Sequence, residues 1–132
     1  MKAEELLYAK THEWVRIEEV GGEKIATVGL SAYALEALTD LVYLELPPPG
    51  TPVRAGEPFG EVESVKAVSD LYSPVDGEII ESNGEIASRL ERLADDPYGA
   101  GWLVRIRVGD ERGLGDLLDH AAYQKHVEQE KG

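Results

Sequence analysis

The chain has 132 residues, enough for one domain with a modest core, and we expect residues 1–132 to form that single domain. Its 26 Asp and Glu residues outnumber its 13 Lys and Arg residues, and the resulting net charge of −13 argues against nucleic-acid binding. The absence of cysteine excludes disulfides, zinc–thiolate sites and thiol catalysis. Redox chemistry would therefore have to come from an attached group.

The sequence contains no signal for a membrane. No apolar run approaches the ~18 residues of a membrane-spanning helix, and residues 1–5 lack a signal or transit pattern. We therefore expect a cytoplasmic protein with no membrane contact. Separately, we expect a monomer.

The N-terminal segment is predicted to form a β-hairpin. Residues 6–17 pass from a polar start into an alternating strand, and the Gly21-Gly22 turn leads into a second strand over residues 24–30. Trp14 is expected to be a half-buried anchor. His12 has no His or Cys neighbour in the sequence, so a hydrogen-bonded histidine is favoured over a metal ligand or a base, and no metal site is predicted.

A short helix and another strand follow. Ser31 is a good N-cap for an amphipathic helix that ends near Asp40. Residues 41–46 alternate as a strand, which the rigid turn at residues 47–50 ends.

Residues 60–74 are the most informative stretch of the chain. Their valines and tyrosine predict two short strands, with Lys66 at or next to the tip of the hairpin between them. Lys66 is the only basic residue between residues 57 and 78. Its acidic, exposed surroundings would keep the ammonium charged, so Lys66 is a poor nucleophile and is better suited to be modified by another enzyme.

Strand and helix patterns alternate beyond this hairpin. Residues 78–81 are predicted as a strand and Asn83-Gly84 as a turn. Apolar residues at helical spacing predict a helix over residues 86–93.

The C-terminal part is predicted as loop, strand and helix. Residues 97–101 form a loop, and residues 102–108 form an alternating strand with Arg105 and Arg107 on its outer face. Apolar residues between positions 114 and 127 predict a C-terminal helix whose apolar stripe packs back on the sheet.

No set of catalytic residues is recognisable. There is no Ser/His/Asp or Cys/His nucleophile set, no P-loop, no dinucleotide-binding glycine motif and no His-rich metal spacing. Carboxylates are too numerous to be informative. The sequence therefore favours a carrier over an enzyme.

Five short motifs together resemble the glycine cleavage system H protein family, over about residues 8–127. They are residues 12–15 (HEWV), 27–30 (TVGL), 42–47 (VYLELP), 63–78 around Lys66 (ESVKAVSDLYSPVDGE) and 96–102 (DPYGAGW). The resemblance implies a mainly β fold. This would be a barrel-sandwich hybrid, like the lipoyl and biotinyl carrier domains, of two small antiparallel sheets with short helices and a C-terminal helix.

The resemblance also implies a function. In this family a lysine carries lipoate in an amide bond, and here that lysine would be Lys66. The lipoyl arm shuttles an aminomethyl group from a pyridoxal-phosphate glycine decarboxylase to a tetrahydrofolate-dependent aminomethyltransferase, and dihydrolipoamide dehydrogenase reoxidises the dithiol. A lipoyl ligase or transferase attaches the lipoate. The chain would thus be a non-catalytic carrier whose cofactor performs the chemistry.

Four further residues are candidates around the arm. By resemblance Glu63, three residues before Lys66, helps the lipoylating enzyme to recognise its target. The cationic, water-labile aminomethyl end of the arm needs a groove with carboxylates and apolar walls. Asp70 is close to Lys66 in the chain, and Glu13 belongs to a motif that the family places near the arm. We expect these two to anchor the arm, with Thr11 as a hydrogen-bonding neighbour.

Two other assignments remain open. A lipoyl or biotinyl domain of a different complex is disfavoured by the residues before Lys66 and by the motifs at residues 12–14 and 97–99. A lipoate relay protein, which donates lipoyl groups to other apoproteins, cannot be separated on residues. Leu90 and Ala94 replace a proline and an asparagine usual in the family, and they predict a more regular helix there.

Overall fold

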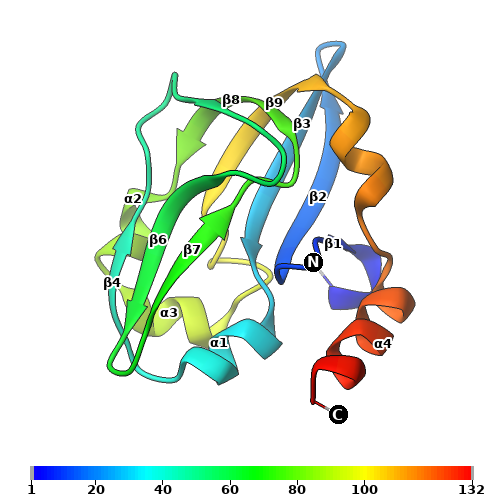
Figure 1. Ribbon diagram of the computed structural model, residues 1–132. Coiled ribbons are helices and arrows are strands. Elements are labelled where there is room, and N and C mark those ends of the chain that lie inside the picture. The colour runs from blue at the N-terminus through cyan, green and yellow to red at the C-terminus, as the bar shows by residue number, and fades with distance from the viewer. Residues whose placement is uncertain (1, 132) are drawn as a thin grey trace.

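The computed structural model describes residues 2–131, the side chain of Arg112 excepted, and is built mainly of β-strands (Figure 1). The strands are β1 (Leu7–Tyr8), β2 (Glu13–Val20), β3 (Glu23–Leu30), β4 (Leu41–Glu45), β5 (Pro52–Val53), β6 (Pro58–Ser64), β7 (Val68–Tyr72), β8 (Asp76–Ser82) and β9 (Val104–Asp110). The helices are α1 (Ala32–Leu38), α2 (Gly84–Ala87), α3 (Leu90–Asp95), α4 (His120–Lys131) and the 3₁₀ turns η1 (Ala3–Glu5) and η2 (Arg112–Asp116). Within residues 2–131, no helix combines the length and the apolar character needed to cross a membrane.

The strands form two antiparallel sheets of unequal size. The larger has the order β1-β2-β3-β9-β8-β5, and the smaller has the order β4-β6-β7. Figure 1 shows the three-stranded sheet opposite the long strands β2, β3 and β9, with α1 and α3 at the end where the β6–β7 hairpin turns. This arrangement confirms the predicted mainly β fold with two antiparallel sheets, short helices and a C-terminal helix.

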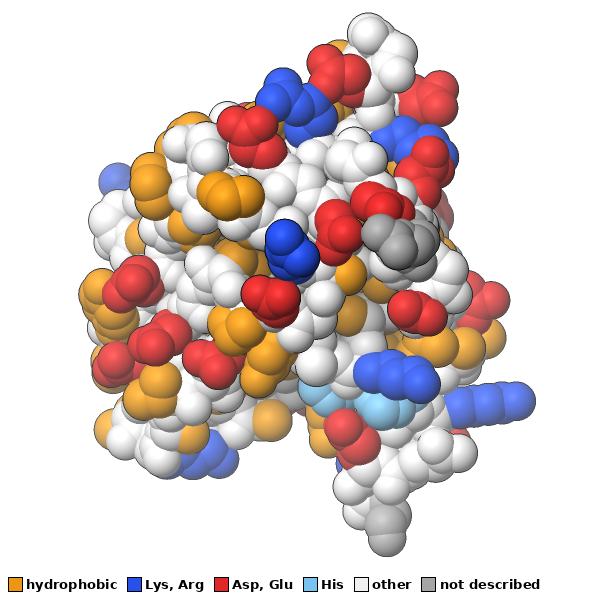
Figure 2. Space-filling model, turned by 45° about the horizontal axis from the view of Figure 1, so that its top comes forward, with side chains coloured by type: hydrophobic (Ala, Val, Ile, Leu, Met, Phe, Trp, Pro, Cys, Tyr) orange, Lys and Arg blue, Asp and Glu red, His pale blue; other side chains and the backbone are white. Residues whose placement is uncertain are grey.

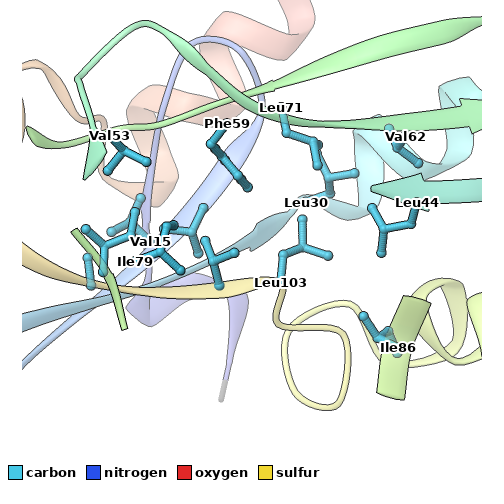
Figure 3. Packing of buried hydrophobic residues seen from close by; sticks show 14 of the residues in the cluster. Val15, Leu30, Leu44, Val53, Phe59, Val62, Leu71, Ile79, Ile86 and Leu103 are labelled. Carbon is cyan, nitrogen blue, oxygen red and sulfur yellow. The ribbon is translucent and has the colours of Figure 1, made fainter. Parts of the chain in front are cut away.

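The main core fills the space between the two sheets. Leu71 of the three-stranded sheet faces Leu30 of the six-stranded sheet (Figure 3), and Val62 and Ile79 belong to the same cluster; each of the four is exposed by 4% or less. Their inward direction follows from the alternation of side chains along each strand. Burying one such side chain contributes about 1.5–3 kcal/mol, so this layer holds the two sheets together.

A second cluster attaches α4 to the N-terminal segment. It consists of Leu6, Tyr8, Trp14, Tyr123 and Val127. The rings of Tyr8 and Tyr123 stack with their centroids 4.3 Å apart. Trp14 is only 2% exposed, so it is buried and not half-buried as expected, and its indole N–H donates to the carbonyl of Pro97 at 2.9 Å.

Gly29 shows how closely β3 approaches Trp14. A Cβ placed on Gly29 would lie 2.5 Å from atoms of the Trp14 ring, well inside van der Waals contact. Only glycine fits at this position, which explains why a glycine stands inside the buried half of β3.

Caps and turns lie where the sequence predicts them. Gly21 and Gly22, with φ of 60° and 83°, connect β2 to β3. The Ser31 side chain accepts a hydrogen bond from Ala34 N–H at 3.2 Å and caps α1. Positive φ values and N-caps of this kind depend on a few neighbouring residues, so sequence alone identifies them.

The connection between β8 and β9 differs from the prediction. Asn83 is not in a turn, because its side chain accepts from Ile86 N–H and caps α2. The helix expected over residues 86–93 is interrupted where Ser88 bonds back to the carbonyl of Glu85 and Arg89 leaves helical geometry (φ −139°, ψ 66°). The more regular helix predicted here is therefore wrong.

The C-terminal helix is shorter than predicted. Leu114 lies in η2, and Leu118 forms an isolated antiparallel bridge with Tyr8, so α4 begins only at His120. The buried residues of α4 are Tyr123 and Val127. The predicted apolar stripe is thus divided among a 3₁₀ turn, a bridge and a helix.

Candidate functional site

Lys66 lies at the tip of the β6–β7 hairpin, as the sequence predicts. Ser64 N–H donates to the carbonyl of Ala67 at 2.8 Å, and the Ser64 hydroxyl oxygen accepts from Ala67 N–H at 3.1 Å. Val65 N–H donates to the carbonyl of Asp40 at 2.9 Å, which joins the tip to the segment after α1. The backbone that presents Lys66 is therefore fixed by contacts inside and outside the hairpin.

The side chain of Lys66 is exposed between apolar and acidic neighbours. Among residues 2–131 it has no hydrogen-bond or ion-pair partner. Val65 and Val68 on either side are exposed by 70% and 61%. Glu63 is half-buried on the outer face of β6, directly opposite Tyr43 of β4 and Val68 of β7. The amine is thus free and surrounded by a surface that another protein can contact.

A groove of about 630 Å³ begins just beyond the lysine tip. Its walls come from β7, from α1 and from residues 10–13, and buried apolar residues of the core form part of its lining. Thr11, Glu13 and Asp70 all line it. The structure therefore brings together the three residues that the sequence singled out for docking the arm.

Glu13 is buried at the wall of this groove. It is 1% exposed, and its two carboxylate oxygens accept from Tyr72 N–H at 3.1 Å and from the Thr11 hydroxyl. Burial raises the pKa of Glu13 to about 7, although both hydrogen bonds act in the opposite direction. A carboxyl group that changes charge near neutral pH therefore stands at the wall of the groove.

Asp70 is exposed and belongs to a row of carboxylates. Glu45 lies directly opposite Glu61, and Glu61 lies directly opposite Asp70, so the row crosses all three strands of the smaller sheet. No cation among the described residues pairs with any of the three. Figure 2 shows acidic side chains between apolar ones on the side of the molecule where β4, β6 and β7 lie. Like charges placed opposite each other are destabilising, so this face has a cost in stability.

His12 is hydrogen-bonded, which confirms the favoured interpretation. It has φ of 82°, and its ring lies between two side chains of α4. Nδ1 is 2.8 Å from the Tyr123 hydroxyl, and Nε2 is 2.7 Å from a carboxylate oxygen of Glu130. Burial lowers the pKa of His12, and the Glu130 carboxylate opposes that shift.

The sequence did not predict a group of potential metal ligands that the fold brings together. His12, His126 and Glu130 each offer one ligand atom, and these atoms all lie within 4.8 Å of one another. Sequence reasoning missed the group because α4 comes from the opposite end of the chain. The one local signal was the spacing of His126 and Glu130, which places both on the same side of a helix.

Comparison with known proteins finds similarity over nearly the whole chain. The family model described as "Glycine cleavage H-protein" matches residues 6–130. A glycine cleavage system H protein of Rhodopirellula baltica is 50% identical over 120 residues, which are 91% of this chain and 90% of that protein. The same-named protein of Rubrobacter xylanophilus is 50% identical over 128 residues, covering 97% and 96% of the two chains.

A solved structure is similar as well. The crystal structure of a glycine cleavage system H protein from Mycobacterium marinum matches with a TM-score of 0.81 and 39% sequence identity. The match covers 94% of this chain and 97% of that one.

Proposed function

The chain belongs to the glycine cleavage H-protein family, and from this premise we propose that it is the lipoyl carrier of the glycine cleavage system, with Lys66 as the attachment point. Proteins of this family carry lipoate and work with the other components of that system. The proposed cargo is an aminomethyl group, taken from glycine decarboxylase to the aminomethyltransferase, with dihydrolipoamide dehydrogenase as the reoxidising partner. The observation that carries the proposal is the free lysine on a fixed tip beside a groove.

The surroundings of Lys66 suit an acylated lysine. The exposed amine has no described partner that acylation would leave unpaired, and the adjoining Val65 and Val68 offer apolar contact to a hydrocarbon chain. When bound, a lipoyl group supplies the disulfide–dithiol chemistry that a chain without cysteine lacks.

The groove suits a cationic cargo. Asp70 presents an exposed carboxylate to an ammonium group. Glu13, with its pKa near 7, would ionise more completely as a cation approaches, because an opposite charge favours the charged form of a carboxyl group. The Thr11 hydroxyl donates to Glu13 and fixes the direction of its carboxylate. We assign anchoring to Glu13 and Asp70 and orientation to Thr11.

Glu63 is the proposed contact for the lipoyl ligase or transferase. It lies on the outer face of β6 near the lysine and has no described cationic partner, so it is free to pair with a basic residue of the enzyme. Glu63→Ala should slow lipoylation without unfolding the protein. Equal rates for the variant and the parent would remove this role from Glu63.

The decisive test replaces the lysine. Lys66→Arg should abolish lipoylation and glycine turnover completely while leaving the unfolding curve unchanged, because an arginine stays charged and exposed but is not acylated. Lys125→Arg is the matched control, since Lys125 is also exposed and should remain irrelevant. Intact mass after incubation with lipoyl ligase, followed by reconstitution with the three partner enzymes, gives both readouts.

Two results would contradict the assignment. A lipoyl group on Lys66→Arg would place the attachment point elsewhere. A normally lipoylated parent that fails to support glycine turnover but donates lipoyl groups to other apoproteins would favour the lipoate relay.

The docking residues are tested by the stability of the loaded arm. A charge-assisted hydrogen bond contributes about 1.5 kcal/mol or more, so Asp70→Asn and Glu13→Gln should each release the aminomethyl group as formaldehyde and ammonia about tenfold faster. Glu91→Gln, an exposed carboxylate outside the groove, is the control and should release at the parent rate. Unchanged release in both groove variants would mean that the arm is protected by other residues.

A further inference from the structure

We propose that His12, His126 and Glu130 form a binding site for one divalent transition-metal ion such as Zn²⁺, at the junction of α4 with the segment that precedes β2. This site is separate from Lys66 and does not depend on the carrier function.

The distances between the three side chains are close to those of a metal site. Zn²⁺ binds imidazole nitrogen and carboxylate oxygen at about 2.0–2.2 Å, so two ligands of a tetrahedral ion lie roughly 3.3–3.5 Å apart. The three ligand atoms already lie within 4.8 Å of one another, and the closest pair, His12 Nε2 and the Glu130 carboxylate, is 2.7 Å apart. The side chain of Glu130 is 40% exposed and long, so small rotations can bring the group to a shared ion.

The ring of His12 is held as metal-binding histidines are held. Its Nδ1 contacts the Tyr123 hydroxyl at 2.8 Å, and that hydroxyl lies 2.7 Å from the Ser31 hydroxyl, which also caps α1. Such an outer partner fixes ring orientation and tautomer in metal sites. With metal on Nε2, the single proton of the neutral ring resides on Nδ1, where the Tyr123 oxygen accepts it and the Tyr123 hydroxyl donates to Ser31.

The second histidine comes from the same helix as the carboxylate. His126 Nε2 is 3.5 Å from Glu130, and the rings of His12 and His126 have their centroids 5.6 Å apart. The Nε2–H of His126 donates to the carbonyl of Lys10 at 2.9 Å, so the ring already spans the junction between α4 and the N-terminal segment. This hydrogen bond would have to be released, with loss of its proton, for Nε2 to bind the ion. An ion held by all three residues would cross-link these two parts of the chain.

The chemistry of the ligands selects the kind of ion. Two imidazoles with one carboxylate suit Zn²⁺, Ni²⁺ or Cu²⁺, whereas Mg²⁺ and Ca²⁺ prefer sites made of oxygen alone. His12 and Glu130 also line the groove that contains Glu13 and Asp70. Metal binding would therefore fix one wall of that groove to α4.

The test measures Zn²⁺ affinity of the complete chain by competition with a chromophoric chelator. The parent should bind one equivalent, Mg²⁺ should not displace it, and Co²⁺ in its place should show the visible bands of a tetrahedral ion. His126→Ala should lower the affinity by at least the roughly 10–100-fold that loss of an outer partner costs a metal site. The matched control is His120→Ala, because His120 also lies on α4 but outside the group, and it should bind Zn²⁺ as the parent does.

The outcomes decide the proposal. Should His126→Ala fail to fold, Glu130→Gln decides in its place, because it preserves the size of the side chain on an exposed part of the helix. Equal affinities of the parent and the variant, an equal loss in His120→Ala, or displacement of Zn²⁺ by Mg²⁺ would each overturn the site. Shifts of the His12 and His126 ring signals in NMR spectra on adding Zn²⁺, with the His120 signals unmoved, would support it.

Discussion

The two sheets arrange their outward charges in opposite ways. On the six-stranded sheet Arg105 lies directly opposite Glu81, and Arg107 directly opposite Glu78, and both pairs form salt bridges. On the three-stranded sheet carboxylates lie opposite carboxylates, in the row of Glu45, Glu61 and Asp70, with no described cation beside them.

The outward arginines of the six-stranded sheet are paired with carboxylates of the same chain, whereas the carboxylate row of the three-stranded sheet has no such pairing among residues 2–131. Exposed salt bridges such as those of Arg105 and Arg107 each contribute at most about 1 kcal/mol, but they give the carboxylates Glu81, Glu78 and Glu23 a cationic partner within the chain. The carboxylate row has an electrostatic cost within the chain and lies beside the exposed valines at the lysine tip. A basic partner surface would compensate that cost on binding, so we expect the three-stranded sheet to be the recognition face and the six-stranded sheet to be the frame.

The largest effect is expected where the two sheets meet, at Glu13. This residue of β2 accepts a hydrogen bond from Tyr72 of β7, and burial raises its pKa from 4.5 to about 7. The folded state therefore holds the proton more tightly than the unfolded chain, so this contribution to stability is complete below pH 4.5 and is lost as the pH rises through 7. Between those limits the free energy of unfolding should fall by about 3 kcal/mol in the parent relative to Glu13→Gln.

Urea unfolding at several pH values measures this difference. Glu91→Gln, which removes an exposed carboxylate, should follow the parent at every pH. Parallel curves for the parent and Glu13→Gln would show that Glu13 does not titrate in this range.

The next effect compares packing in the frame with packing on the recognition face. Gly29→Ala places a Cβ 2.5 Å from the buried Trp14 ring and should lower the free energy of unfolding by about 1–3 kcal/mol, because the ring is held by Pro97 and cannot move freely. Val68→Ala on the three-stranded sheet removes an exposed side chain and should change stability by less than about 0.5 kcal/mol. Thermal and urea unfolding of both variants check this order. Equal losses in the free energy of unfolding would contradict the distinction between frame and recognition face.

The smallest effect tests the charges directly. Glu61→Lys places a cation between Glu45 and Asp70 and should raise the free energy of unfolding by about 0.2–1 kcal/mol. Glu81→Lys puts a second cation opposite Arg105 and should lower it by a similar amount. Both differences should shrink in high salt, because screening weakens exposed charges. Changes of the free energy of unfolding with the same sign in the two variants would contradict the difference in charge arrangement between the sheets.

Local chemistry explains what the sequence could predict. The Gly21-Gly22 turn, the Ser31 cap and the lysine tip depend on residues adjacent in the chain, and the structure places all three as expected. Alternation of apolar residues also identified strands such as β6 and β9, which bury one face in the core. The mainly β fold could therefore be predicted from the sequence.

The features that the sequence did not predict depend on burial and on contacts between residues far apart in the chain. Glu13 was expected to anchor the arm, but its burial beside β7 was not predicted, because nothing within residues 6–17 indicates that β7 packs there. His12 and Glu130 meet because the cluster that includes the stacked rings of Tyr8 and Tyr123 packs α4 against the start of the chain. The break between α2 and α3 likewise follows from backbone geometry that the apolar spacing does not encode.

The hydrogen bond from Val65 to Asp40 affects how a modifying enzyme would recognise Lys66. Asp40 follows α1 and is not part of the β6–β7 hairpin, yet it holds the backbone next to Lys66. A lipoylating enzyme that acts on Lys66, as we propose, would therefore meet a conformational epitope, assembled from two separate segments, and not a linear one. To transplant this lysine site onto another protein, the end of α1 would have to be grafted together with the hairpin.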